Sequence, residues 1–302
     1  MLEASKFDLI VSIVVYKPDI GKLKQTLNSL FNCDLNLMIY IVDNSPTPWP
    51  PAVYENPRNN LCYLFNAGRN IGFGRAHNIN IRKHVDNSKY FLILNPDIYF
   101  DPSILEAMIE RMDADKEIGL SIPKICYPNG EIQHVNRRLP RPQDYLFSFI
   151  NTKTRRRLFW SKKYRQYLLQ DMNLEKPLTC PVISGCFMFF RSKCLKELGG
   201  FDERFFLYLE DTDLSRRAFL KYKTVIFSDL LAYHHWKRGG HKSVKLFLTQ
   251  ARNTLRYFNK WGWLTDIQRS QCNKKVCYYN SKNVLKSSSV NTQSEKKNTV
   301  EL

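Results

Sequence analysis

The chain has 302 residues, of which 43% are hydrophobic and 13% aromatic, enough to bury a large core. Its formal net charge of +18 is unevenly placed: residues 1–135 carry a net of −2 and residues 136–302 a net of +20. A basic half of this kind is expected to face a polyanion such as phospholipid, phosphate groups or nucleic acid. A solvated basic surface is the alternative.

The cysteines and the hydropathy of the chain predict its cellular compartment. The eight cysteines form no CxxC pair, which argues against a disulfide scaffold or a structural zinc site and favours a reducing cytoplasm. The N-terminal apolar run, residues 9–16, is shorter than the roughly 20 residues that a bilayer-spanning helix needs. It also lacks the basic start and cleavage site of a secretory signal. We therefore expect a soluble or peripheral protein.

Strands and helices alternate over the first 115 residues. Strands are predicted at residues 9–16, 37–42 and 90–94, and helices at residues 22–31, 76–85 and 101–115. The first strand is a nearly unbroken β-branched run, which is typical of a strand buried on both faces. This order predicts an α/β fold with an open, mainly parallel sheet flanked by helices.

The second half changes character. Residues 137–167 are rich in arginine, lysine and aromatics, and residues 263–302 form a polar stretch that we expect to be a disordered tail. Between them, strands are predicted at residues 182–191 and 224–227, and helices at residues 211–222 and 243–261. We expect one domain over residues 1–262, divided at about residue 135 and ending in a basic helical appendage.

Two carboxylates follow predicted strands. Asp43 comes after residues 37–42, and Asp97 comes after residues 90–94 in an Asn95-Pro96-Asp97 sequence. Ligands of open α/β sheets bind beyond the carboxyl ends of the strands. Asp97 is therefore a candidate ligand for Mg²⁺ or Mn²⁺, and Asp43 is a candidate acceptor for a nucleotide base or ribose. An ordinary strand-terminal turn remains an alternative for both.

A glycine loop opens the predicted helix at residues 76–85. The segment from Asn70 to Asn78 contains Gly72 and Gly74, which allow the backbone to approach a ligand closely. A helix N-terminus also favours phosphate. The loop lacks the third glycine of a dinucleotide fingerprint and the Gly-Lys-Ser/Thr of a P-loop, so it supports neither of those sites.

Three acids and two histidines complete the candidate chemistry. Glu210, Asp211 and Asp213 lie within a stretch of four residues in a half of the chain that is otherwise basic. Repulsion between such close carboxylates raises the pKa of one of them, which suits a general base. Acids stabilising a helix N-terminus are the alternative. His234 and His235 follow a strand-like run and are candidate nitrogen ligands, or ordinary surface or core residues.

Taken together, these segments resemble the inverting family-2 glycosyltransferases with a GT-A fold, in particular their bacterial rhamnosyltransferase-like branch. The resemblance covers about residues 9–262. The segments that carry it are SIVVY at residues 12–16, VDNS at 42–45, NIGFG at 70–74 with Asn78, LNPD at 94–97, SGCFM at 184–188, GGFDE at 199–203 and EDTDL at 210–214. Their order and spacing are more specific than any one of them alone.

The resemblance implies a role for each candidate. Asp211, paired with Glu210, would be the catalytic base, and Asp97 with His235 would hold Mg²⁺ or Mn²⁺. His234, Gly185 and Asp213 would lie near the acceptor. The donor would be bound by Tyr16, Asp43, Asn44, Asn70, Gly72, Phe73, Gly74, Asn78 and Asn95. Asn95 stands where the full DxD motif has its first acid, so this metal would have one protein carboxylate fewer.

The resemblance also implies partners and a location. It implies transfer of a sugar, with rhamnose from dTDP-rhamnose as the first choice, to a polyprenyl-diphosphate-linked glycan in O-antigen or capsule biosynthesis. Galactose, glucose and N-acetylhexosamine remain alternatives. Residues 137–167 would bind the anionic inner face of the cell membrane from the cytoplasm. A nucleic-acid-binding module is the rival class, but the acid cluster opposes it and no helix-turn-helix or zinc-finger pattern is present.

Overall fold

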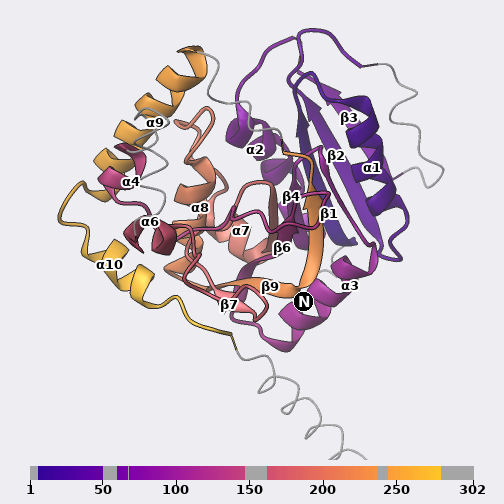
Figure 1. Cartoon of the computed structure of the whole chain (residues 1–302). Helices are drawn as coiled ribbons and strands as arrows, with labels where there is room; N and C mark the ends of the chain where they lie inside the picture. Colours follow the sequence, from indigo (N-terminus) through magenta and orange to yellow (C-terminus); the bar gives the residue numbers. More distant parts are fainter. Residues whose placement is uncertain (1–5, 50–59, 67, 147–161, 237–243, 280–302) are drawn as a thin grey trace, which may run out of the picture.

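The computed structural model describes residues 6–49, 60–66, 68–146, 162–236 and 244–279. Within these residues one nine-stranded sheet runs through the molecule in the order β3-β2-β1-β4-β8-β6-β9-β5, with β7 paired to β9 (Figure 1). Helices flank this sheet. The expected α/β fold with a mainly parallel sheet is therefore confirmed.

The N-terminal half contains the parallel part of the sheet. Strand β1 pairs in parallel with β2 and β4, and β2 pairs in parallel with β3. The sequence reading missed β3, a five-residue strand of alternating burial that follows residues 50–59. The elements are β1 (Phe7–Val15), α1 (Ile20–Phe31), β2 (Leu37–Asp43), β3 (Leu61–Phe65), α2 (Phe73–His84), the short helix η2 (Val85–Asn87) and β4 (Ser88–Leu94).

The chain after β4 inserts an antiparallel strand into the sheet. Strand β8 lies between β4 and β6 and is antiparallel to both, whereas β6 and β9 are parallel to each other. The elements are β5 (Ile98–Phe100), α3 (Ser103–Ala114), β6 (Ile118–Cys126), α4 (Pro142–Leu146), α6 (Lys162–Tyr167), β7 (Leu178–Thr179), β8 (Phe187–Arg191), α7 (Ser192–Leu198), α8 (Glu210–Phe219) and β9 (Lys223–His234).

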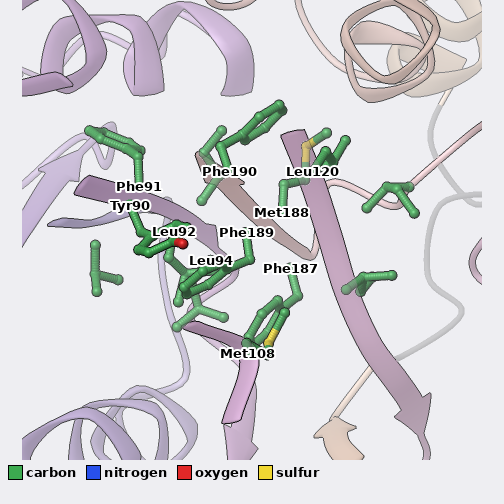
Figure 2. Packing of buried hydrophobic residues seen from close by; sticks show 14 of the residues in the cluster. Tyr90, Phe91, Leu92, Leu94, Met108, Leu120, Phe187, Met188, Phe189 and Phe190 are labelled. Carbon is green, nitrogen blue, oxygen red and sulfur yellow. The ribbon is translucent and has the colours of Figure 1, made fainter. Parts of the chain in front are cut away.

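Strand β8 is central because its side chains are apolar on both faces. Phe187 to Phe190 are fully buried, and Figure 2 shows them packed among residues of β4, β6 and α3. The Phe187 ring lies 5.6 Å from that of Phe100, and the Phe189 ring lies 5.3 Å from that of Tyr90. Fully burying such side chains contributes about 1.5–3 kcal/mol each, which fixes the position of the loop before β8.

The C-terminal helices are α9 (Val244–Trp261) and α10 (Ile267–Lys274). The expectation of a separate basic appendage is not confirmed. Tyr257 and Phe258 of α9 are fully buried against Phe205 and Leu209, the residues that lead into α8. Helix α10 also lies inside the stretch expected to be a tail, where Asp266 caps it by accepting a hydrogen bond from the Arg269 N–H at 2.9 Å. The rest of that stretch, residues 280–302, lies outside the described residues.

Candidate active site

Several candidate residues meet at one edge of the sheet. Strands β2, β4 and β9 run in the same direction, so their carboxyl ends bring Asp43, Asn95 and His234 to that edge. The antiparallel β8 begins there, and the Asn95 N–H donates to the Cys186 carbonyl at 2.9 Å. The sheet therefore places the SGCFM segment beside the Asn95-Pro96-Asp97 turn. Both lie at the carboxyl ends of the parallel strands, where open α/β sheets bind their ligands.

Asp97 faces His234. The Asp97 Oδ1 lies 3.3 Å from the Nε2 of His234, whose side chain is almost fully buried. Burial acts to raise the pKa of Asp97, but the hydrogen bond and charge of His234, together with the charge of Lys22, hold it below its ordinary value. Asp97 is therefore a carboxylate at neutral pH.

The tautomer of His234 follows from Gln133. The Gln133 Nε2 donates to the His234 carbonyl at 2.7 Å, which fixes the orientation of the amide. Its Oε1 then accepts from the His234 Nδ1 at 3.1 Å. Nε2 is therefore the nitrogen that faces Asp97: with a proton it makes the hydrogen bond that lowers the pKa of Asp97, and in the neutral ring its lone pair could bind a cation shared with that carboxylate. Gln133 belongs to none of the sequence motifs, so the sequence did not predict this role.

The expected ligand His235 points elsewhere. Its Nε2 pairs with the Gln25 Oε1 of α1 at 2.7 Å, and its ring lies 5.1 Å from that of Tyr99. The reason is strand geometry, because successive side chains of an extended chain point to opposite sides. The structure brings His234, rather than His235, to Asp97.

Asp97 and His234 could hold a divalent cation only together with further ligands. One carboxylate oxygen and one imidazole nitrogen are suitable donors for Mn²⁺ or Mg²⁺. In the part of the chain that the structure describes, no group of three His, Cys, Asp or Glu residues could hold a metal ion. A cation here would take its remaining ligands from a diphosphate and water.

Asp211 lies in the first turn of α8 and is anchored by two backbone N–H groups. Its Oδ2 accepts from Gly185 at 3.1 Å, and its Oδ1 accepts from Thr212 at 2.7 Å. A Cβ on Gly185 would lie 3.2 Å from the Asp211 Cβ and 3.4 Å from the Phe73 ring. Gly185 thus allows three predicted site residues to meet closely. Asp211 remains partly exposed, as a base that contacts substrate must be.

Glu210 has the opposite environment. It is only 5% exposed, and its Oε2 has no hydrogen-bond partner among the residues that the structure describes. Burial, and then the charge of Asp211, raise the pKa of Glu210 well above its ordinary value. The environment of Glu210 therefore favours its protonated form, and its neighbour Asp211 is the residue of the pair that solvent can reach.

Asp213 points away from this site, toward α9. It is fully buried; its Oδ2 accepts from Arg217 at 2.9 Å, and its Oδ1 accepts from Trp261 at 2.8 Å and pairs with Lys260 at 2.6 Å. We expected Asp213 near the acceptor. Its carboxylate is instead committed to holding α9 against α8.

Asn78 is also committed to internal contacts. Its amide oxygen accepts from the Phe201 N–H at 2.9 Å, and its amide nitrogen donates to the Phe201 carbonyl at 2.8 Å and to Glu203 at 3.1 Å. Gly74 allows this packing, because a Cβ there would lie 2.8 Å from the Phe201 Cβ. Asn78 and Gly74, predicted to bind donor, serve in this structure to join α2 to the GGFDE segment.

The other donor candidates form a connected network at the end of β2. The fully buried Asp43 accepts from the Ser45 N–H at 2.7 Å and from the Tyr63 hydroxyl at 2.6 Å. Asn44 donates to the Gly72 carbonyl at 3.3 Å, and the Asn70 side chain accepts from the Gly72 N–H at 3.0 Å. The glycine loop and the end of β2 are thus tied together. Tyr16 lies after β1 and is 50% exposed.

The loop before α8 is strained. Tyr208 and Leu209 have φ values of 73° and 72°, a left-handed conformation that costs non-glycine residues about 1–3 kcal/mol each. Its neighbours hold the loop in place: the Phe73 N–H donates to the Phe206 carbonyl at 3.0 Å, and Asn253 of α9 donates to the Leu207 carbonyl at 2.8 Å. Residues 202–209 contain no glycine, so the sequence did not indicate this left-handed conformation.

Comparison with known proteins identifies the family of the chain. The glycosyl transferase family 2 model matches residues 11–199. N-acetylglucosaminyl-diphospho-decaprenol L-rhamnosyltransferase of Mycobacterium tuberculosis (strain CDC 1551 / Oshkosh) is 28% identical over 225 residues, which cover 69% of each chain. Rhamnosyltransferase WbbL of Escherichia coli (strain K12) is 23% identical over 262 residues, covering 82% of this chain and 92% of that one.

Solved structures show the same fold at low identity. GalNAc-T7 with UDP, GalNAc and Mn²⁺ aligns with a TM-score of 0.62 and 16% identity, covering 84% of this chain and 49% of that one. S. aureus TarS 1–349 in complex with UDP-GlcNAc aligns with a TM-score of 0.55 and 16% identity, covering 88% and 70%. The chain therefore belongs to glycosyl transferase family 2 and is a glycosyltransferase with a GT-A fold.

Proposed function

We propose that this glycosyltransferase transfers L-rhamnose, with inversion, from dTDP-rhamnose to a glycan linked through a diphosphate to a polyprenol. The observation that carries the proposal is Asp211, a partly exposed carboxylate fixed by the Gly185 N–H beside Phe73. The choice of sugar and acceptor is supported by the names of the two rhamnosyltransferases to which the chain is similar.

The donor would lie between the glycine loop and the ends of β2 and β4. Asp43, held by Tyr63 and the Ser45 N–H, would accept from the nucleobase or ribose once the donor rearranges these bonds. The turn at Asn70–Gly72 and the start of α2 would lie along the sugar-phosphate part. The first turn of α2 contains no acid, which suits an anionic ligand.

A divalent cation, Mg²⁺ or Mn²⁺, would be held by Asp97 and His234 and would neutralise the charge of the departing nucleoside diphosphate. The protein prepares this site in two ways. The Gln133 amide keeps the Nε2 of His234 toward Asp97, and the lowered pKa of Asp97 keeps its oxygens unprotonated. Asn95, the residue in place of an acid, holds the turn through its backbone bond to Cys186.

Asp211 would act as the general base. It takes the proton of the acceptor hydroxyl as that oxygen forms a bond to C1 of the sugar and the bond from C1 to the diphosphate oxygen breaks. The two backbone N–H donors hold the carboxylate in place through this step. Burial raises the pKa of Glu210 and so favours its protonated form, which leaves the partly exposed Asp211 as the acid that would accept the acceptor proton.

The cellular setting is part of the proposal. A polyprenol-linked acceptor is made at a membrane, so we place the enzyme at the cytoplasmic face of the cell membrane, in O-antigen or capsule assembly. No helix in the described part of the chain is long and apolar enough to span a bilayer. The mode of attachment that we propose is peripheral. Of the membrane-facing segment predicted at residues 137–167, residues 147–161 lie outside the described part.

The test is a donor screen with the full chain and a polyprenyl-diphosphate-linked N-acetylglucosamine acceptor. dTDP-rhamnose, UDP-glucose, UDP-galactose and UDP-N-acetylhexosamines are compared by release of nucleoside diphosphate, with Mn²⁺ and with EDTA. We expect release from dTDP-rhamnose, and loss of release in EDTA. Turnover of a UDP-sugar at a rate above that of dTDP-rhamnose would replace rhamnose by that sugar, and equal rates in EDTA would remove the cation from the proposal.

A further inference from the structure

The C-terminal helices present an exposed apolar surface. On α9, Val244, Leu248 and Leu255 recur at helical spacing and are 76%, 60% and 54% exposed. The chain that follows adds Leu264, which is 86% exposed, and Ile267, which is 71% exposed. We call these five residues the apolar surface. Figure 1 shows α9 and α10 at the side of the molecule opposite β3 and α1.

Basic residues border the apolar surface. Residues 244–265 contain no acid. Arg252 is exposed on α9 one turn from Leu248 and Leu255. Burial, and then the charges of Arg252 and Arg204, lower the pKa of Arg256. Arg204, with 66% of its side chain exposed, also pairs with Asp202 at 2.6 Å. Like charges gathered beside exposed leucines match an anionic interface rather than an apolar protein partner.

The dimensions of α9 suit a helix that lies along a membrane. It has 18 residues, and neither it nor any other described helix meets the length and hydropathy of a membrane span. A helix with one apolar face and a basic border binds in the plane of the interface, with its apolar side chains roughly 5–10 Å into the lipid. Its other face is already occupied, because Tyr257 and Phe258 are fully buried in the protein.

The apolar surface is rigidly connected to the catalytic helix. Asp213 of α8 holds Lys260 and Trp261 of α9. Arg216 of α8, which is fully buried, makes two hydrogen bonds of 2.6 and 2.7 Å to Asp266, the residue that precedes α10. These contacts tie α9 and the start of α10 directly to α8.

We propose that the apolar surface docks on a bilayer that contains anionic phospholipid, and that the contacts of α9 and α10 with α8 then hold Asp211 at a fixed distance from that bilayer. The second part rests on the proposed function, since it concerns a membrane-linked acceptor. The first part does not. None of its five residues belongs to residues 137–167, to which the sequence assigned the membrane contact, although Tyr145 of that segment packs against Phe258 of α9.

Vesicle binding tests the docking. Full-length chain is sedimented with vesicles of phosphatidylcholine alone, or of phosphatidylcholine with phosphatidylglycerol. We compare wild type with Leu248→Ser/Leu264→Ser/Ile267→Ser, and with Leu64→Ser, which changes a leucine that is 42% exposed on the distant β3. We expect wild type and Leu64→Ser to bind the anionic vesicles, and the triple variant to bind them at least about tenfold more weakly, given three lost apolar contacts.

Two further measurements test the role of the basic residues and the link between docking and catalysis. Arg252→Gln should weaken anionic vesicle binding by about fivefold, because one basic residue near an anionic surface contributes about 1 kcal/mol. The triple variant should keep wild-type rates on a short-chain, water-soluble acceptor and lose rate on the same acceptor glycan carried in vesicles. That pattern separates loss of docking from loss of folding.

Three results would overturn the proposal. The first is wild-type binding that is absent, or equal on neutral and anionic vesicles. The second is a triple variant that binds as wild type does. The third is a wild-type dimer in solution that the triple variant converts to a monomer, which would assign the surface to a second copy of the chain. If binding follows expectation but no lipid-linked acceptor is used, the docking stands and the proposed function fails.

Discussion

Replacing Asp211 by asparagine tests the proposed base with little change of shape. Asp211 accepts from the Gly185 N–H at 3.1 Å and from the Thr212 N–H at 2.7 Å. The asparagine oxygen can keep one of these bonds, whereas its NH₂ group faces the other donor. We expect a stability loss of about 1 kcal/mol from the lost bond, seen as a fall of about 2–4 °C in Tm for a chain of this size.

The rate should fall far more than the stability. A general base contributes about 10²–10⁴-fold, or roughly 2.7–5.4 kcal/mol of barrier, and asparagine cannot take a proton. Turnover is measured as nucleoside diphosphate release at saturating donor and acceptor, with donor affinity measured separately by calorimetry. Donor affinity should be nearly unchanged. A variant that retains more than about a tenth of wild-type turnover, a change of only roughly 1.4 kcal/mol, would refute the assignment.

Glu210→Gln is the matched comparison. Because burial raises the pKa of Glu210 well above its ordinary value, the protonated form is favoured, and glutamine reproduces the shape and neutrality of that form. Turnover should stay within about threefold of wild type, roughly 0.7 kcal/mol. If Glu210→Gln loses as much rate as Asp211→Asn, then the exposed and buried acids have been assigned the wrong way round.

Three further predictions concern the pH dependence, the cation site and the buried ion pair. The folded chain keeps a proton on Glu210 that the unfolded chain loses above pH 4.5, so wild-type stability should fall as the pH rises past that value, by at most about 1.4 kcal/mol per pH unit. Glu210→Gln should remove this decline, as measured by denaturation at pH 4 to 8. His234→Ala should weaken Mn²⁺ binding by more than about tenfold, or roughly 1.4 kcal/mol, in titrations with nucleoside diphosphate present, whereas His235→Ala should not. Asp266→Asn should cost about 3–5 kcal/mol in urea unfolding, because it leaves the buried charge of Arg216 unpaired.

The controls for these predictions use residues of the same type in other environments. Asp86 pairs with Lys196 at 2.7 Å, and both side chains are more than half exposed. Asp86→Asn should therefore cost less than about 1 kcal/mol in the same urea experiment. Equal losses for Asp86→Asn and Asp266→Asn would contradict the argument from burial. Stronger loss of Mn²⁺ in His235→Ala than in His234→Ala would return the ligand to the residue that the sequence favoured.

The fold was predictable because its signals are local. Apolar runs predicted β1, β2 and β4, and the helices α1, α3 and α9 were also predicted, with bounds that the structure places within a few residues of the expected ones. The antiparallel orientation of β8 was not predictable from its pattern, because a strand buried on both faces reads the same in either direction. Helix α10 was missed because its sequence is polar and its order comes from Asp266 and Arg269.

The sequence predicted many of the residues that gather at the candidate site, but not the direction in which each side chain points. The cluster of acids was visible, yet on a helix each residue turns by about 100°, so Glu210 enters the interior, Asp211 faces Gly185 and Asp213 faces α9. The histidine pair shows the same limit on a strand, where one position decides which ring meets Asp97. Spacing along the sequence could not decide either case without the register of the element.

The strained loop links the two sides of the proposed reaction. Tyr208 and Leu209 keep their left-handed conformation although it is unfavourable, so the contacts on either side must hold them. Those contacts come from the glycine loop through Phe73, on the side where the donor would lie, and from Asn253 of α9, which continues into the apolar surface. The first residues of α8 follow directly. The position of Asp211 therefore depends on both the donor loop and the C-terminal helix, which is the arrangement expected if the base must meet a donor from solution and an acceptor from a membrane.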